Sequence, residues 1–183
     1  MICRRQKTDP AFEAPFHSET ELRLLGVIFQ ENLQWDMHID YVMRSASKRV
    51  FILKEMKKIK SITKRDLIHV YFSQIRSIIE YNCPVFVGLN TRNNCKLNKL
   101  QRRCHRIICG KGCSCDLFPN LESRRDDLAM KVFHKMMQPA HQLNSLMPLF
   151  LPSGKRLSFP FCNTLRRKSS FIPMCTLRFN KQN

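Results

Sequence analysis

Apolar residues recur at the spacing of an α-helix through much of this chain, and this pattern restricts the fold more than any other feature. The first such stretch begins at Asp36, and its apolar residues fall on one side of a helix: Ile39, Val42, Ala46, Val50, Leu53 and Met56. Residues three and four apart lie on the same side of an α-helix, so the stretch predicts an amphipathic helix that packs through this side. Asp36 is the expected N-cap.

Three more stretches follow the same rule. The second begins at Thr63, pairs it with Asp66 in a capping-box pattern, and stops before Pro84. The third runs from about residue 94 to residue 108 and stops at Gly110, a typical C-cap residue, and the fourth spans about residues 120–137. The central part of the chain is therefore predicted to be a bundle of about four helices.

The two ends of the chain lack this period. Residues 1–20 are polar and are expected to be a disordered lead-in, whereas residues 21–34 contain a short apolar run that predicts a strand or hairpin. Residues 139–183 are broken by prolines and combine phenylalanines with basic residues, so we expect an irregular tail whose rings either stack on bases or cover a core. The predicted fold class is mainly α, with the helical unit over residues 35–138.

Positive charge is the second strong feature. The chain has 32 Lys and Arg residues against 14 acids, a formal net charge of +18, which favours a polyanionic partner, most often nucleic acid. Seven basic residues and no acid lie between Arg92 and Lys111. The residues expected to contact phosphates are Arg44, Lys48, Lys58, Lys99, Arg102, Arg103 and Arg106. Such contacts neutralise phosphates without reading sequence, and a solvated helix face is the alternative.

Nine cysteines are an odd number for a disulfide framework. The N-terminus is charged where a signal peptide would be apolar, and no run reaches the length of a membrane span. We therefore expect an intracellular protein, nuclear or cytoplasmic, that is not secreted, has free thiols and has no membrane partner. Cys109, Cys113, Cys115 and His105 are candidate zinc ligands, although their spacing matches no zinc template.

A series of sequence blocks resembles the end of a non-LTR, LINE-type retrotransposon reverse transcriptase, downstream of the catalytic palm. The blocks occur in the family's order: residues 25–29 (LGVIF), 33–35 (LQW), 46–49 (ASKR), 76–86 (RSIIEYNCPVF), 97–108 (LNKLQRRCHRII), 170–173 (SFIP) and 177–180 (LRFN). The chain departs from the family pattern at Ser77, Phe86 and Phe179, where the pattern has Pro, Trp and Trp. The resemblance implies a palm-edge strand followed by a helical thumb that holds a template–primer duplex.

The same resemblance implies that the polymerase chemistry lies outside this chain. The family enzyme uses paired carboxylates to hold Mg²⁺, whereas the only adjacent acids here are Asp126 and Asp127, inside a predicted helix. We interpret that pair as a solvated helix face and expect a fragment that is not an enzyme, needs no cofactor, and binds RNA or an RNA–DNA duplex independently of sequence. A palm-containing polymerase fragment is a second candidate partner.

Two alternatives stay open. One is a non-functional relic of a mobile element. The other is a helical interaction module similar to the N-terminal domain of AlkB-type tRNA dioxygenases and methyltransferases. The residues His38-Ile39-Asp40 share the His-x-Asp spelling of a dioxygenase iron site, but we interpret His38 as a helix-entry residue because no barrel pattern surrounds it.

Overall fold

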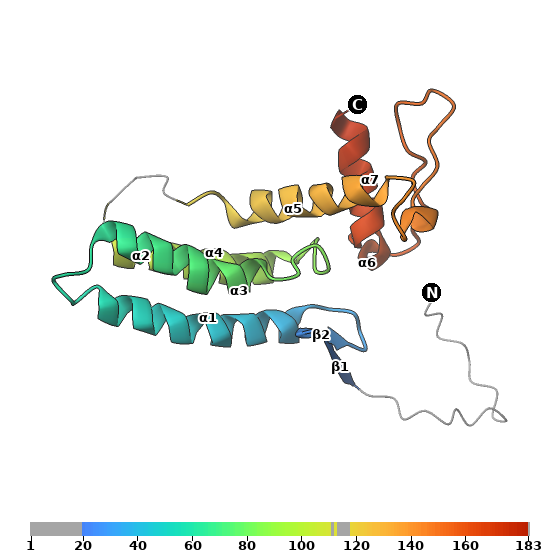
Figure 1. The fold of residues 1–183 in the computed structure, drawn as a ribbon. Helices are drawn as coiled ribbons and strands as arrows, with labels where there is room; N and C mark the ends of the chain where they lie inside the picture. Colours follow the sequence, from blue (N-terminus) through green and yellow to red (C-terminus); the bar gives the residue numbers. More distant parts are fainter. Residues whose placement is uncertain (1–19, 111, 113–117, 183) are drawn as a thin grey trace.

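A computed structural model describes residues 20–110, 112 and 118–182 of the chain (Figure 1). The described part is mainly helical and begins with a two-stranded antiparallel hairpin, which confirms the predicted fold class. Nearly all of the expected lead-in, residues 1–19, lies outside the described residues. Among the described helices, none combines the length and the apolar character that crossing a membrane requires.

The N-terminal apolar run forms a hairpin of β1 (Glu21–Leu24) and β2 (Val27–Gln30), paired from Glu21 opposite Gln30 to Leu24 opposite Val27. Of the two expected arrangements, strand or hairpin, the chain adopts the hairpin because it reverses at Leu25 and Gly26, whose φ angles are 46° and 80°. Two successive positive φ angles are typical of the tight turns that join antiparallel strands. Val27 is buried against the helices.

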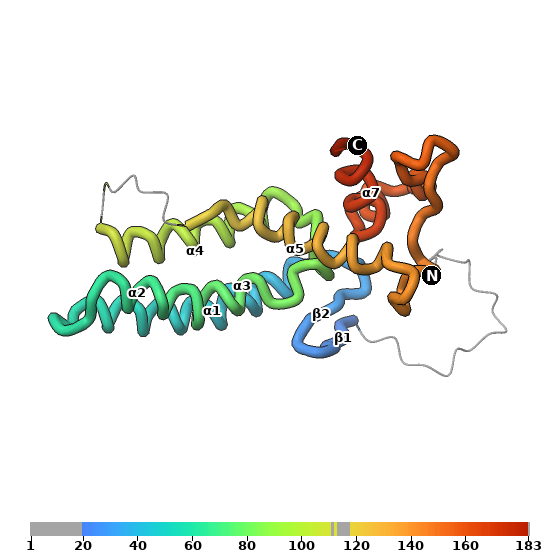
Figure 2. Tube along the Cα trace, turned by 45° about the horizontal axis from the view of Figure 1, so that its top comes forward, coloured from blue at the N-terminus to red at the C-terminus, as the bar shows by residue number. Residues whose placement is uncertain are grey.

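Three long helical segments lie side by side and form the main core (Figures 1 and 2). They are α1 (Asp36–Met56), the continuous run of α2 (Lys64–Val70), η1 (Tyr71–Arg76) and α3 (Ser77–Glu80), and α4 (Thr91–Cys109). The apolar side predicted for α1 is buried in this core, with Met56 only partly buried. The hairpin lies at one end of the bundle and the loop between α1 and α2 at the other (Figure 1).

Helix boundaries follow the local signals with one exception. Thr63 and Asp66 form the predicted capping box, and Gly110 ends α4 with a φ of 89°. Asp36 is not the N-cap of α1, since Trp35 occupies that position and makes no side-chain cap. The Asp36 carboxylate instead accepts a hydrogen bond from Asn93 Nδ2 at 3.0 Å. The predicted cap therefore serves as a link between two helices.

The second helix contains a π-helical segment, η1, between α2 and α3. Its last residue, Arg76, is buried, and its Nε donates to Glu80 Oε1 at 2.7 Å. Arg124 donates to the same carboxylate from α5 (Leu121–Met136), through Nε at 2.7 Å and Nη2 at 3.1 Å. Glu80 thus joins the second helix to α5.

The tail is more regular than expected. It contains η2 (Asn144–Leu146), α6 (Leu165–Lys168) and a twelve-residue helix, α7 (Phe171–Gln182), which packs against α5 (Figure 1). A second core of Val87, Ala129, Phe133, Leu157 and Cys175 lies at this junction. Phe171 and Phe179 pack against this core, which favours the core-covering role for these two rings.

Candidate nucleic-acid interface

Helices α1 and α4 lie beside each other and run in the same direction. Three polar contacts join them in the same order along both helices: Asp36 with Asn93, Asp40 with Lys96, and Lys57 with the carbonyl of Ile108. The Lys96 Nζ to Asp40 Oδ1 distance is 2.5 Å and the Lys57 Nζ to Ile108 O distance is 3.3 Å. These contacts fix the rotation of each helix, and so determine which side chains point outward.

The outward sides of both helices are basic. On α1, Arg44 and Lys48 are exposed on the side opposite the buried residues. On α4, every basic residue predicted to contact phosphates is exposed: Lys99, Arg102, Arg103 and Arg106. We call these six residues the basic face. Among the described residues, none of the six forms an ion pair with an acid.

The structure brings some of the predicted basic residues of α1 close to those of α4. Arg44 lies one turn beyond Asp40 on α1, whereas Lys99 and Arg103 lie one and two turns beyond Lys96 on α4. Because Asp40 and Lys96 are in contact, these side chains follow the same junction between parallel helices. Lys48, Arg102 and Arg106 lie further around their helices, so the face is broad and spans both helices.

Lys58 differs from the other predicted phosphate-binding residues. It lies beyond the end of α1 and pairs with Glu55, with an Nζ to Oε2 distance of 2.7 Å and a side chain that is 64% exposed. Its charge is therefore partly compensated. The sequence placed Lys58 on the face of the first helix, because the apolar period does not show that the helix ends at Met56.

Two residues of the outward side do not appear among the predicted contacts. Lys54 is exposed on α1, and Phe51 is 62% exposed three residues after Lys48. Both fall outside the apolar stripe of α1, so the helical period that identifies Lys48 also places Phe51 outside the core. Positive charge, the signal that identified the other residues of this surface, does not mark a phenylalanine.

Other basic residues serve the fold. Arg125 is buried and donates to Asn94 Oδ1, and Arg178 pairs with Asp126 at 2.5 Å. The Arg178–Asp126 pair corrects the interpretation of both adjacent acids as a solvated helix face, because Asp126 joins α5 to α7, while Asp127 is exposed. A charge run in the sequence does not separate such residues from those that face solvent.

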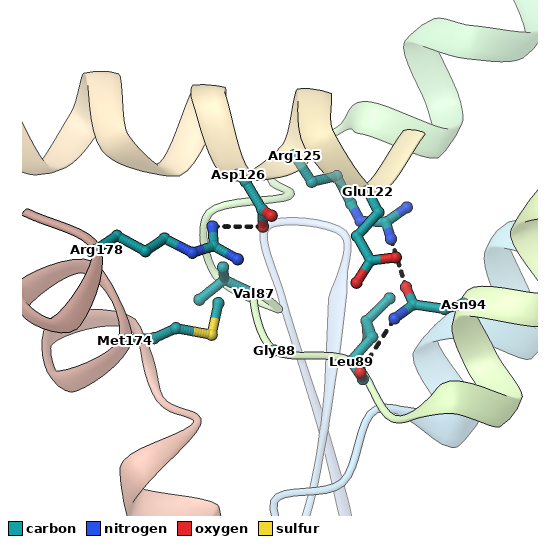
Figure 3. A pocket seen from close by; sticks show the side chains of 9 residues that line it. All are labelled: Val87, Gly88, Leu89, Asn94, Glu122, Arg125, Asp126, Met174 and Arg178. Carbon is teal, nitrogen blue, oxygen red and sulfur yellow. Dashed lines mark hydrogen bonds and ion pairs between the residues drawn. The ribbon is translucent and has the colours of Figure 1, made fainter. Parts of the chain in front are cut away.

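These structural basic residues, Arg125 and Arg178, line a small pocket of about 90 Å³ (Figure 3). Arg125, Arg178, Glu122 and Asp126 line it, so its two positive charges face two negative ones. Gly88 closes one side, and a Cβ there would lie 2.4 Å from the carbonyl oxygen of Ser169. The pocket lies where α4, α5 and α7 meet, and the contacts of Arg125 with Asn94 and of Arg178 with Asp126 join these helices.

The zinc candidate is only partly described. The His105 ring lies 5.8 Å from the Phe118 ring, and Cys109 packs against the main core, whereas Cys113 and Cys115 lie outside the described residues. Cys104 is fully buried, and burial raises its pKa to about 12. Within the described ranges, no group of three or more His, Cys, Asp or Glu side chains is placed to hold a metal ion.

His38 enters α1 in its first turn, as predicted. It is buried, and its Nδ1 accepts a hydrogen bond from the backbone N–H of Ile28 at 3.4 Å. Asp40 lies on the α4 side of the helix and binds Lys96. The two side chains of the His-x-Asp sequence therefore point to different neighbours.

Comparisons with protein-family models, with curated proteins and with solved structures find no match to this chain.

Proposed function

We propose that the basic face binds the phosphate backbone of an RNA–DNA duplex without reading its sequence. The observation that carries this proposal is a set of exposed cations that form no ion pair with an acid among the described residues. They lie on two parallel helices, and the three acids of α1, Asp36, Asp40 and Glu55, are each bound to another residue. Positive side chains on helix faces neutralise phosphates and release counterions. Their backbone contacts position a duplex but do not specify bases.

The sequence resemblance supports the choice of nucleic acid. The blocks similar to the post-palm region of LINE-type reverse transcriptases include most of α4, and four residues of the basic face lie in that block. In that family the helical thumb holds a template–primer duplex. We therefore propose that this chain is the corresponding fragment of such a polymerase, which binds nucleic acid and carries no catalytic carboxylates of its own.

The test is fluorescence anisotropy of a labelled RNA–DNA hybrid at several salt concentrations between about 50 and 200 mM. The variant Lys99→Ala/Arg102→Ala/Arg103→Ala/Arg106→Ala should bind more weakly. The slope of log affinity against log salt should fall by about one for each phosphate that the variant no longer neutralises. All four side chains are exposed, so the fold should survive, which circular dichroism checks.

A matched control separates position from charge. Lys131→Ala/Lys135→Ala/Arg166→Ala/Arg167→Ala removes four exposed basic residues from α5 and α6. This variant has the same net charge as the first and should keep most of the salt slope. Equal weakening in both variants would show that only the net charge matters, and absence of binding at low salt would contradict the proposal outright.

A further inference from the structure

An exposed aromatic ring lies within the basic outward side of α1. Phe51 is 62% exposed, although a phenylalanine is ordinarily placed in a core. No ring contact between Phe51 and another described residue is present. Its exposure is not a consequence of an irregular segment, because it lies inside the 21-residue helix α1.

Three of the four residues that neighbour Phe51 on the helix surface are charged, and the fourth is Ser47. Residues three and four apart are surface neighbours, so Lys48 and Lys54 each lie one turn from the ring, and Arg44 lies two turns away. Glu55 also lies one turn away, but it is paired with Lys58. The ring therefore lies among cations whose charges face solvent.

A ring among cations matches the chemistry of single-stranded nucleic acid. In a duplex the bases are stacked on one another and the outside presents phosphates, which need only the cations. A single strand presents free base faces together with phosphates, and proteins that hold it combine basic grooves with aromatic side chains on which bases stack. Binding of a duplex backbone gives Phe51 no role, whereas a single strand can stack a base on the ring while its phosphates lie on Lys48 and Lys54.

We infer that the basic face also binds single-stranded RNA or DNA, with one base stacked on the ring of Phe51. This inference rests on the proposed function, because the basic face, with Lys54 beside it, holds the backbone of the strand. It adds a preference: a single strand, or a hybrid with a single-stranded overhang, can place a base on the ring, which a blunt hybrid cannot do.

The experiment compares two labelled probes, a single-stranded RNA of about 16 nucleotides and a blunt RNA–DNA hybrid of about the same length. Phe51→Ala should weaken binding of the single strand by about 5- to 150-fold, the range expected when one stacked base is removed. Binding of the blunt hybrid should change by less than about two-fold. Ile52→Ala is the matched control, since Ile52 is the adjacent residue and is 53% exposed.

Two further variants separate stacking from general apolar contact. Phe51→Leu keeps an apolar side chain without a ring and should behave as Phe51→Ala, whereas Phe51→Trp should retain or strengthen single-strand binding. Full affinity in Phe51→Leu would overturn the stacking inference, and so would an equal weakening on both probes.

The two proposals fail in different ways. If the four-alanine variant of α4 lowers the salt slope but Phe51→Ala leaves single-strand affinity unchanged, the basic face stands and the stacking inference falls. If the four-alanine variant changes binding of neither probe, the basic face itself is wrong and the inference falls with it.

Discussion

The carboxylate of Glu80 forms a buried ion pair with Arg76 in its own helical run and also binds Arg124 of α5, and replacing it tests what the buried pair contributes to stability. It accepts hydrogen bonds from Arg76 and Arg124, and the side chains of the Arg76–Glu80 pair are only 8% and 13% exposed. Removing one partner of a buried pair costs about 3–5 kcal/mol, because the other charge stays buried without compensation. Glu80→Gln keeps one oxygen that accepts a hydrogen bond, which restores about 1 kcal/mol.

The expected loss for Glu80→Gln is therefore about 2–4 kcal/mol in the free energy of unfolding. Arg124 adds little to this figure, because its side chain is 40% exposed and water replaces the missing partner. Urea unfolding followed by circular dichroism measures the loss, and with a slope of about 2 kcal/mol per molar urea the midpoint should fall by about 1–2 M.

Glu55→Gln makes the same chemical change in an exposed pair. The Lys58 and Glu55 side chains are 64% and 42% exposed, so this loss should stay below about 1 kcal/mol. Should the two variants lose the same stability within error, the burial of the Arg76–Glu80 pair would have no energetic consequence and the reasoning would be refuted.

The same pair predicts a dependence on pH. Burial raises the pKa of Glu80, but the hydrogen bonds from Arg124 and Arg76 outweigh it, and the net effect lowers the pKa below its ordinary value of 4.5. A carboxyl group with a lowered pKa stabilises the fold above its unfolded value and loses that stabilisation as the pH falls through the folded value. The wild type should therefore lose more stability than Glu80→Gln below pH 4.5.

Two further predictions test other joints. Burial lowers the pKa of His38 below 6.5, so the free energy of unfolding should fall as the pH drops below 6.5. Trp35, the only tryptophan, lies beside His38, and its fluorescence reports unfolding. His38→Gln should remove this pH dependence of stability. Gly88→Ala places a Cβ 2.4 Å from the carbonyl oxygen of Ser169 at a φ of 75°, and should lower the free energy of unfolding, measured with urea, by more than about 2 kcal/mol. Gly154→Ala is the control: nothing lies within 4 Å of its Cβ, so the loss should be about 1 kcal/mol.

The helices could be predicted because their signals are local. The apolar period of α1, the Thr63–Asp66 capping box and the Gly110 C-cap each depend on residues within a few turns of one another. The role of Asp36 could not be predicted in the same way, because its partner, Asn93, lies 57 residues away in the sequence. A capping residue and a helix-joining residue have the same local sequence signature.

The tail shows how a correct rule gives an expectation that holds only in part, because helices occupy residues 165–168 and 171–182. Its prolines predict irregular structure, yet Pro173 is the third residue of α7. The backbone N–H groups of the first turn have no partner within their own helix, so a proline there removes no hydrogen bond. The sequence alone does not show that a helix begins two residues before that proline.

The positions of the acids explain, better than the net charge does, why the cations of the basic face have no acidic partner among the described residues. Asp36, Asp40, Glu80 and Asp126 each bind a partner on another helix, so they are held at the joints of the fold. Glu55 is held by its neighbour Lys58. None of these acids is free to neutralise the outward side of α4. The same contacts that assemble the helices therefore leave the cations of the basic face for an external anion.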